Sequence, residues 1–171
     1  AILCKEFGPP EKLVLEEVPS PAPKAGELLL AVHACGLNFA DTLIIQGLYQ
    51  EKPPLPFSPG AEVAGEVLAV GEGVRGFTPG MRVVALASTG GFAEEVVVPA
   101  AVAMPLPDSM DYKTAASFTI AYGTSHVALE HRANLQAGET LLVHGAAGGV
   151  GLTAVELGKL LGATVIATAS T

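Results

Sequence analysis

The chain contains the stretch His144-Gly145-Ala146-Ala147-Gly148-Gly149-Val150-Gly151, a glycine-rich turn between two segments of different periodicity. The residues before it, 140–144, form a short apolar run that is typical of a buried strand. Residues 150–161 carry apolar side chains at helical spacing, and a second apolar run follows at 164–168. A strand, a glycine turn, a helix and a second strand in this order predict a β-α-β unit with parallel strands.

This glycine turn is a candidate site for the pyrophosphate of a dinucleotide. A helix that opens directly after a strand presents its first amides to an anion at the positive end of the helix dipole. Gly148 would let the backbone approach the pyrophosphate, and Gly151 would let the helix pack tightly on the strand. The first glycine of the usual pattern is replaced by Ala146. The candidate cofactor-binding residues are Ala147, Gly148, Gly149, Val150 and Gly151. The alternative is a tight strand-to-helix turn that binds no nucleotide.

The end of the second strand bears on the choice of cofactor. An acidic residue that binds the adenosine ribose of NADH is expected at this tip. The sequence there reads Thr168-Ala169-Ser170-Thr171, without a carboxylate that would repel a 2′-phosphate. The hydroxyls of Ser170 and Thr171 could donate hydrogen bonds to that phosphate. NADPH is therefore favoured over NADH.

The chain before the glycine turn has a different character. Up to about residue 105 it consists of short apolar runs, such as 28–33 and 61–70, separated by Gly and Pro turns. This pattern predicts a mostly antiparallel β domain. One helix is expected to begin at Asn38, where Asp41 three residues on would complement the helix dipole.

The periodicity becomes helical over residues 108–131, with Asp108 or Ser109 as the expected N-cap. We place a domain boundary at this change of period. The prediction is a β domain over residues 1–107 and an incomplete α/β domain over residues 108–171.

Composition excludes several classes of protein. Half of the 171 residues are apolar and 15% are charged, as in a globular chain with a core. The net charge of −8 disfavours nucleic acid or an anionic membrane as the main partner. Two cysteines do not make a disulfide framework, and no apolar run is long enough to span a bilayer. A cytoplasmic location is expected, with a mitochondrial one as the alternative because the chain lacks an initiator Met.

Five motifs along the chain are informative when taken together. They are Gly36-Leu37-Asn38-Phe39-Ala40-Asp41-Thr42, Gly47-Leu48-Tyr49, Pro59-Gly60-Ala61-Glu62-Val63-Ala64-Gly65, Gly80-Met81-Arg82-Val83-Val84 and the glycine turn. Together they resemble the zinc-free medium-chain dehydrogenase/reductases, in the quinone oxidoreductase (zeta-crystallin) branch. The resemblance implies a GroES-like, mostly antiparallel β catalytic domain followed by the first β-α-β of a Rossmann domain, with the nicotinamide in the cleft between the two domains. A complete member is longer and is expected to be a homodimer.

The resemblance also indicates which positions hold a metal in other branches. Zinc-dependent relatives take one catalytic ligand from a Cys and one from a His at the positions of Asn38 and Ala61. Zinc needs three or four N, S or O ligands, so no metal is predicted. We expect Cys35 to be a small core residue and Glu62 to form local hydrogen bonds. Most of the histidines, including His144, are expected to be structural.

The resemblance implies a role for four more side chains. Asn38 would contact the nicotinamide or the substrate, Asp41 would organise the turn, Tyr49 would line the quinone pocket and Thr124 would bond the carboxamide. Each has a structural alternative: Asn38 and Asp41 as helix caps, Tyr49 as a half-buried loop aromatic, and Thr124 bonded to its own helix.

The implied activity is NADPH-dependent reduction of quinones or conjugated enals and enones by hydride transfer without zinc. Family members often have Tyr-Ile-Arg where this chain has Leu43-Ile44-Ile45, which favours less polar enals or enones. The alternative is a truncated, non-catalytic isoform or fragment with a binding or structural, crystallin-like role.

Overall fold

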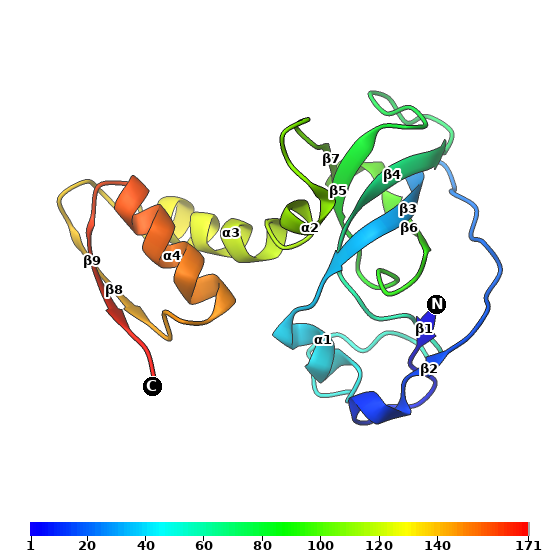
Figure 1. Ribbon diagram of the computed structural model, residues 1–171, viewed down its shortest axis with the longest axis horizontal. Helices are drawn as coiled ribbons and strands as arrows, with labels where there is room; N and C mark the ends of the chain where they lie inside the picture. The colour runs from blue at the N-terminus through cyan, green and yellow to red at the C-terminus, as the bar shows by residue number, and fades with distance from the viewer. Residues whose placement is uncertain (171) are drawn as a thin grey trace. The chain divides into compact units, whose positions relative to one another are not determined.

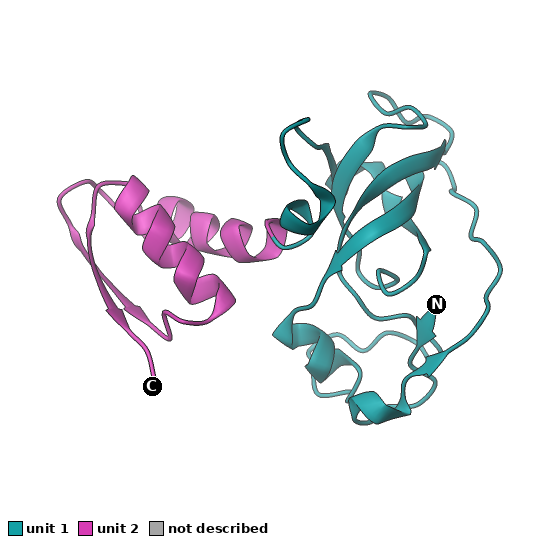
Figure 2. Cartoon of the chain, viewed as in Figure 1, with its two compact units in different colours: residues 1–117 teal, residues 118–171 magenta. Residues whose placement is uncertain are grey.

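The computed structural model describes residues 1–170 of the chain (Figure 1). These residues form two compact units, unit 1 at Ala1–Ser117 and unit 2 at Phe118–Thr171, which Figure 2 shows in different colours. Unit 1 holds the expected β domain, and unit 2 holds the expected β-α-β unit. Each unit is described by itself below.

The main sheet of unit 1 has five strands, and every neighbouring pair is antiparallel. This confirms the mostly antiparallel β prediction. The strand order is β6-β3-β4-β5-β7. The bounds are β3 (Glu27–Gly36), β4 (Glu62–Val70), β5 (Arg82–Leu86), β6 (Glu95–Pro99) and β7 (Ala103–Pro105). A second sheet pairs β1 (Ile2–Leu3) with β2 (Val14–Leu15), and the short 3₁₀ turns are η1 (Pro10–Lys12) and η2 (Ala100–Val102).

Alternation along these strands builds the main core of unit 1. Successive side chains of a strand point to opposite faces of the sheet, so residues two apart share a face. The buried residues follow this period in three strands: Leu28 and Leu30 in β3, Val83 and Ala85 in β5, and Val96 and Val98 in β6. The sheet thus provides a rigid support for the loops at its ends.

The segment after β7 belongs to unit 1, so the compact units divide later than the predicted boundary at residue 107. Helix α2 (Tyr112–Ala115) packs against the sheet, where Ala115 and Ala116 are buried with Ala64 and Val84. The N-cap of α2 is Asp111, which accepts a hydrogen bond from the Thr114 amide at 2.9 Å. The predicted caps Asp108 and Ser109 were wrong.

Unit 2 begins with α3 (Thr119–His126), which continues into a π-helix, η3 (Val127–Arg132). The β-α-β unit follows as β8 (Thr140–His144), α4 (Gly149–Leu160) and β9 (Thr164–Thr168). The two strands pair in parallel, which confirms the topology predicted from the glycine turn. Helix α4 packs against both strands and against α3.

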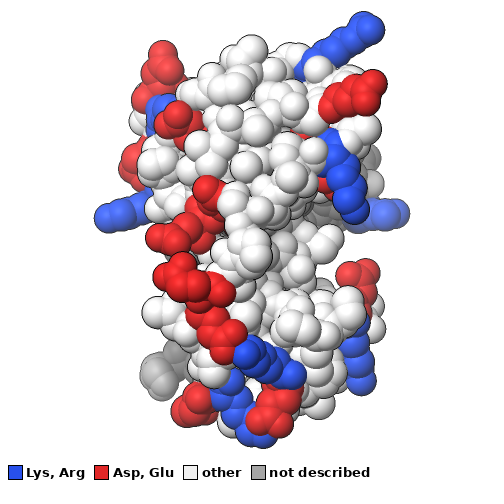
Figure 3. Space-filling model, turned by 90° about the vertical axis from the view of Figure 1, so that its right-hand side faces the viewer, with Lys and Arg blue, Asp and Glu red and all other residues white. Residues whose placement is uncertain are grey.

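Among residues 1–170, no helix combines the length and the apolar character that crossing a membrane would need. Acidic side chains form a band along one edge of the face shown in Figure 3. This is in keeping with the net charge of −8.

Candidate functional site

The glycine turn of unit 2 brings the start of α4 close to the end of β8. Gly145 adopts a positive φ of 66°, and the Gly148 amide donates to the Gly145 carbonyl at 3.0 Å. A Cβ at Gly151 would lie 2.2 Å from the Gly145 oxygen and 2.9 Å from the Ala146 Cα. The close approach of helix and turn therefore requires glycine at position 151, as its predicted packing role implies.

The first turn of α4 leaves backbone amides available. Gly148 is the N-cap, and Leu152 donates to its carbonyl at 2.8 Å. The amides of Gly149, Val150 and Gly151 precede that bond and are the donors that a helix leaves unsatisfied at its N-terminus. A Cβ at Gly149 would meet no atom within 4 Å. Space at the start of the helix is thus open to an anion, which the amides and the helix dipole would stabilise.

The tips of the two parallel strands are joined by a side-chain contact that the sequence did not suggest. His144 Nδ1 lies 2.9 Å from Thr168 Oγ1, and the Ala146 amide donates to the Thr168 carbonyl at 3.0 Å. His144 and Thr168 are register partners, which only the pairing of the strands reveals. Ser170 is exposed just beyond, and Thr171 lies outside the described residues.

Thr124 and Ser125 are adjacent residues of α3 that differ in burial. Thr124 is exposed, whereas Ser125 is buried against α4. The Ser125 hydroxyl donates to the Val150 carbonyl at 2.9 Å. Ser125 therefore supports the first turn of α4, and Thr124 is accessible from outside; its predicted bond to a carboxamide stays a prediction.

In unit 1, Asn38 and Asp41 form a capping box at the start of α1 (Phe39–Ile44). Asp41 Oδ2 accepts a hydrogen bond from the Asn38 amide at 2.8 Å, and Oδ1 accepts one from the Gly60 amide at 3.3 Å. The Asp41 side chain is only 3% exposed. The carboxylate therefore ties the turn before α1 to the loop before β4. The role of Asp41 in a catalytic site stays a prediction.

A second buried carboxylate reaches the side chain of Asn38. Glu62, the first residue of β4, is 1% exposed, and its Oε2 accepts a hydrogen bond from Asn38 Nδ2 at 3.4 Å. Gly36 leaves room for it, because a Cβ at position 36 would lie 2.8 Å from Glu62 Oε2. Asn38 is thus held by Asp41 through its backbone and by Glu62 through its carboxamide. The sequence predicted local hydrogen bonds for Glu62 but did not identify Asn38 as a partner.

Tyr49 packs against a small cluster formed by Cys4, Ile44, Ile45 and Phe57. Ile44 and Ile45 are buried in this cluster. The preference for less polar enals or enones that residues 43–45 suggest stays a prediction. The exposed apolar side chains beside Asn38 are Leu37 and Phe39, at 76% and 79% exposure.

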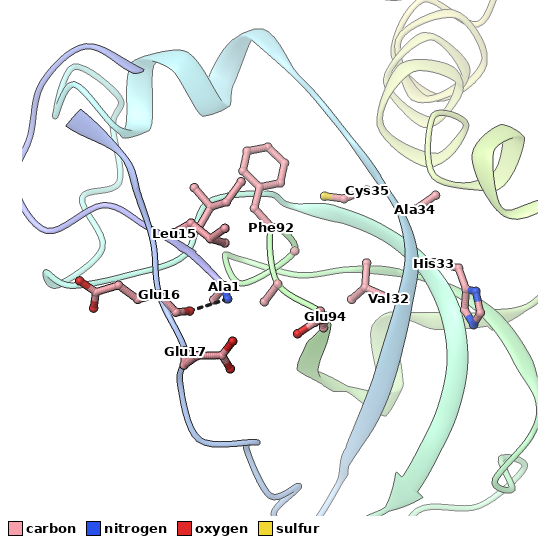
Figure 4. Close-up of a pocket in the computed structure, with 13 residues that line it drawn as sticks. Ala1, Leu15, Glu16, Glu17, Val32, His33, Ala34, Cys35, Phe92 and Glu94 are labelled. Carbon is pink, nitrogen blue, oxygen red and sulfur yellow. Dashed lines mark hydrogen bonds between the residues drawn. The ribbon is translucent and has the colours of Figure 1, made fainter. Parts of the chain in front are cut away.

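A pocket of about 660 Å³ lies elsewhere in unit 1 (Figure 4). Leu15, Cys35 and Phe92 contribute to its wall, together with the acidic Glu16 and Glu94. None of Asn38, Asp41 and Tyr49 lines it. The pocket is therefore separate from the candidate site.

Comparison with known proteins places this geometry in a family. Residues 24–108 match the alcohol dehydrogenase GroES-like domain. Quinone oxidoreductase of Rattus norvegicus is 43% identical over 171 residues, which cover 99% of this chain and 52% of the rat protein. The solved structure of the human synaptic vesicle membrane protein VAT-1 homolog-like protein superposes with a TM-score of 0.97 at 40% identity, covering all of this chain and 56% of that one.

The chain belongs to the medium-chain dehydrogenase/reductase family. A further solved relative is the quinone oxidoreductase of Thermus thermophilus, determined alone and in complex with NADPH. It has a TM-score of 0.87 and 39% identity, and the match covers 100% of this chain and 53% of that one. The chain spans about half the length of the curated relatives it matches.

By the resemblance described above, Asn38 and Ala61 would stand where zinc-dependent relatives have catalytic ligands. That the site holds no zinc stays a prediction. Among residues 1–170, no three His, Cys, Asp or Glu side chains are grouped to hold a metal ion. Burial raises the pKa of the Cys35 thiol to about 11, so Cys35 is a neutral thiol at physiological pH.

Proposed function

We propose that the protein carrying this chain is an NADPH-dependent, zinc-independent reductase of quinones or conjugated enals and enones. The observation that carries the proposal is the start of α4, where three amides precede the first bond within the helix and a Cβ at Gly149 would meet no atom within 4 Å. The quinone oxidoreductase relatives support the reaction type, and the NADPH complex of the Thermus thermophilus relative supports the cofactor.

The residues of unit 2 fit the adenosine half of NADPH. The amides of Gly149, Val150 and Gly151 would bind the pyrophosphate, with Ala147 and Gly148 in the turn beneath it. The Ser170 hydroxyl would donate to the 2′-phosphate, as would Thr171. Thr124, exposed on α3, would instead bond the carboxamide of the nicotinamide half.

When bound, NADPH supplies a hydride; the acceptor gains two electrons from it and then a proton from solvent, while NADP⁺ is left. Asn38 would stabilise the oxygen on which negative charge develops, because its carboxamide carries N–H donors. Asp41 would hold the turn, and Tyr49 would line the substrate side. No step requires a metal.

Exposed apolar side chains around Asn38 support an acceptor with apolar character. Leu37 and Phe39, its two neighbours in the chain, are 76% and 79% exposed. Such side chains gain about 25 cal/mol for each Å² that a ligand removes from water. Flat quinones and alkenals have apolar carbon skeletons that would cover them.

The test is NADPH oxidation, followed by absorbance, with 9,10-phenanthrenequinone and with a 2-alkenal. It compares the complete protein with the 171-residue chain. Turnover by the complete protein is expected, with NADH used less well. If neither NADPH binding nor turnover is found for the complete protein, the reductase proposal is wrong and a non-catalytic binding or structural role stands. Light scattering on the same sample tests the predicted homodimer.

A further inference from the structure

We propose that Glu62 is a positioning residue that fixes the orientation of the Asn38 carboxamide, so that an N–H of this group is presented to the acceptor oxygen. The inference rests on the proposed reductase function and names a residue to which the comparisons assign no role. Its basis is the contact between Asn38 Nδ2 and Glu62 Oε2 at 3.4 Å.

Burying the Glu62 side chain costs free energy. The side chain is 1% exposed, and a carboxylate taken out of water costs several kcal/mol unless hydrogen bonds compensate it. Strand β4 does not need an acid at this place, because its pairing with Gly36 and Leu86 uses the backbone alone. An apolar residue of similar size would be tolerated better by the fold. The acid is therefore best explained by what it contacts.

Gly36 makes the contact between Glu62 and Asn38 possible. Gly36 ends β3 and pairs with Glu62 in the sheet register. Because position 36 has no Cβ, the carboxylate can lie beside the strand and reach the loop that holds Asn38, two residues further on. The sheet register and the missing Cβ at Gly36 together allow the Glu62 carboxyl group to reach the Asn38 carboxamide.

The contact with Glu62 determines which end of the Asn38 carboxamide faces a ligand. An asparagine side chain can bind with its NH₂ or with its oxygen toward a partner, and rotation by half a turn exchanges the two. A carboxyl oxygen that carries no proton only accepts hydrogen bonds, and Glu62 Oε2 accepts one from Asn38 Nδ2, so Glu62 favours the orientation in which Nδ2 faces it. One N–H of Nδ2 is then engaged by Glu62, and the second can donate to a ligand. Asp41 completes the arrangement by holding the Asn38 backbone at 2.8 Å.

The orientation of the Asn38 carboxamide matters for the proposed reaction. Hydride addition to a quinone or an enone moves an electron pair onto a carbonyl oxygen, which later takes a proton from water. A donor that is already oriented stabilises this charge without reorganisation. A carboxamide turned the wrong way would present its oxygen and repel the charge. Glu62 acts through Asn38 and touches neither cofactor nor acceptor in this scheme.

The experiment uses three variants of the complete protein. E62Q keeps the length and an acceptor oxygen, E62D keeps the charge but shortens the reach, and E66Q removes a carboxylate from the same strand as a control. We expect kcat for the quinone to fall about 10-fold in E62D, to stay within about threefold in E62Q and to be unchanged in E66Q, with KM for NADPH constant throughout.

A second readout does not depend on turnover. The side-chain amide protons of Asn38 give a pair of ¹H–¹⁵N signals, which an N38S variant identifies by their loss. In the unmodified protein we expect one of the two protons to exchange more slowly with solvent than in E62D. Unchanged kcat and unchanged exchange in E62D would overturn the inference while leaving the reductase function in place.

Two other outcomes are also decisive. Full activity of E62D together with loss in E62Q would mean that charge matters and reach does not, which contradicts positioning by contact. Absence of turnover in the unmodified protein with every acceptor would overturn the proposed function, and the positioning role with it. Melting temperatures of all three variants show whether the fold is kept.

Discussion

Ser125 and Thr153 place their hydroxyl oxygens 2.8 Å apart where α3 packs against α4. Both side chains are buried, and both hydroxyls lie within hydrogen-bond distance of the Val150 carbonyl, at 2.9 and 3.0 Å. Thr153 Oγ1 also lies 3.0 Å from the Ala121 carbonyl. The two helices therefore share a satisfied, buried polar contact where they pack together.

Replacing Ser125 by alanine should destabilise unit 2. The substitution removes the hydrogen bonds of the Ser125 hydroxyl to the Val150 carbonyl and the Thr153 hydroxyl, and each such bond contributes about 0.5–1.5 kcal/mol. Urea unfolding followed by circular dichroism measures the loss. Thr124→Ala, at the exposed neighbouring position, is the matched control and should change stability by less than about 0.5 kcal/mol. Equal losses in both variants would contradict the assigned contact.

Two glycines of the same turn should respond differently to alanine. A Cβ at Gly151 would lie 2.2 Å from the Gly145 oxygen, so Gly151→Ala should lower stability by about 1–3 kcal/mol. A Cβ at Gly149 meets nothing within 4 Å, so Gly149→Ala should fold normally. Its methyl group would nevertheless occupy the proposed phosphate position, and NADPH affinity should fall about 10-fold. Calorimetric titration with NADPH and thermal melting separate the effects; normal affinity in Gly149→Ala would exclude this phosphate position.

Neither cysteine should react readily in the folded protein. Burial raises the pKa of Cys35 to about 11 and, in direction, that of Cys4. With a pKa of about 11, only about one thiol in a thousand is ionised at pH 8. Because the folded pKa lies above the unfolded value, the stabilising effect of the neutral thiol is full below the ordinary thiol pKa of 9.0 and is lost as the pH rises toward about 11.

Alkylation by iodoacetamide, counted by mass spectrometry, tests this. The rate at Cys35 should rise about tenfold per pH unit between pH 8 and 10. Protein unfolded in urea provides the reference and should react fully at pH 8. Rapid modification of Cys35 in the folded protein at pH 7 would show that its thiol is not shielded.

Arg82 should anchor the segment before α2. Its guanidinium donates to the carbonyls of Asp108 and Met110 and lies 4.7 Å from the centre of the Tyr112 ring, on which His33 also stacks. Losing these contacts in Arg82→Met should cost about 1–2 kcal/mol of local stability. Trypsin cleavage after Lys113 should then be about fivefold faster or more. Arg75→Met, at an exposed turn, is the control and should leave the cleavage rate unchanged.

Local patterns in the sequence were enough for the parts of the fold that depend on neighbours along the chain. The strands Thr140–His144 and Thr164–Thr168 were placed correctly, because a glycine turn between a strand and a helix constrains both. The start of α1 at Asn38 followed from capping chemistry in the same way.

Contacts between distant residues could not be predicted. Asn38 and Glu62 are 24 residues apart, and their meeting depends on the pairing of β3 with β4. The burial of Ile44 and Ile45 depends on Cys4 and Phe57, which are remote in sequence. Sequence pattern alone therefore gives no sign that Ile44 and Ile45 pack in this cluster.

Gly36 also limits how this region can evolve. A methyl group there would lie 2.2 Å from the Ala116 carbonyl as well as 2.8 Å from the Glu62 carboxylate. One substitution would thus disturb the packing of the segment after α2 and the placement of the acid beside Asn38 at the same time. A second substitution that relieves only one of these two contacts would not restore the structure. A variant at position 36 would therefore need compensating changes at both contacts. Position 36 should consequently be among the least tolerant in a saturation-mutagenesis screen, even though it carries no side chain of its own.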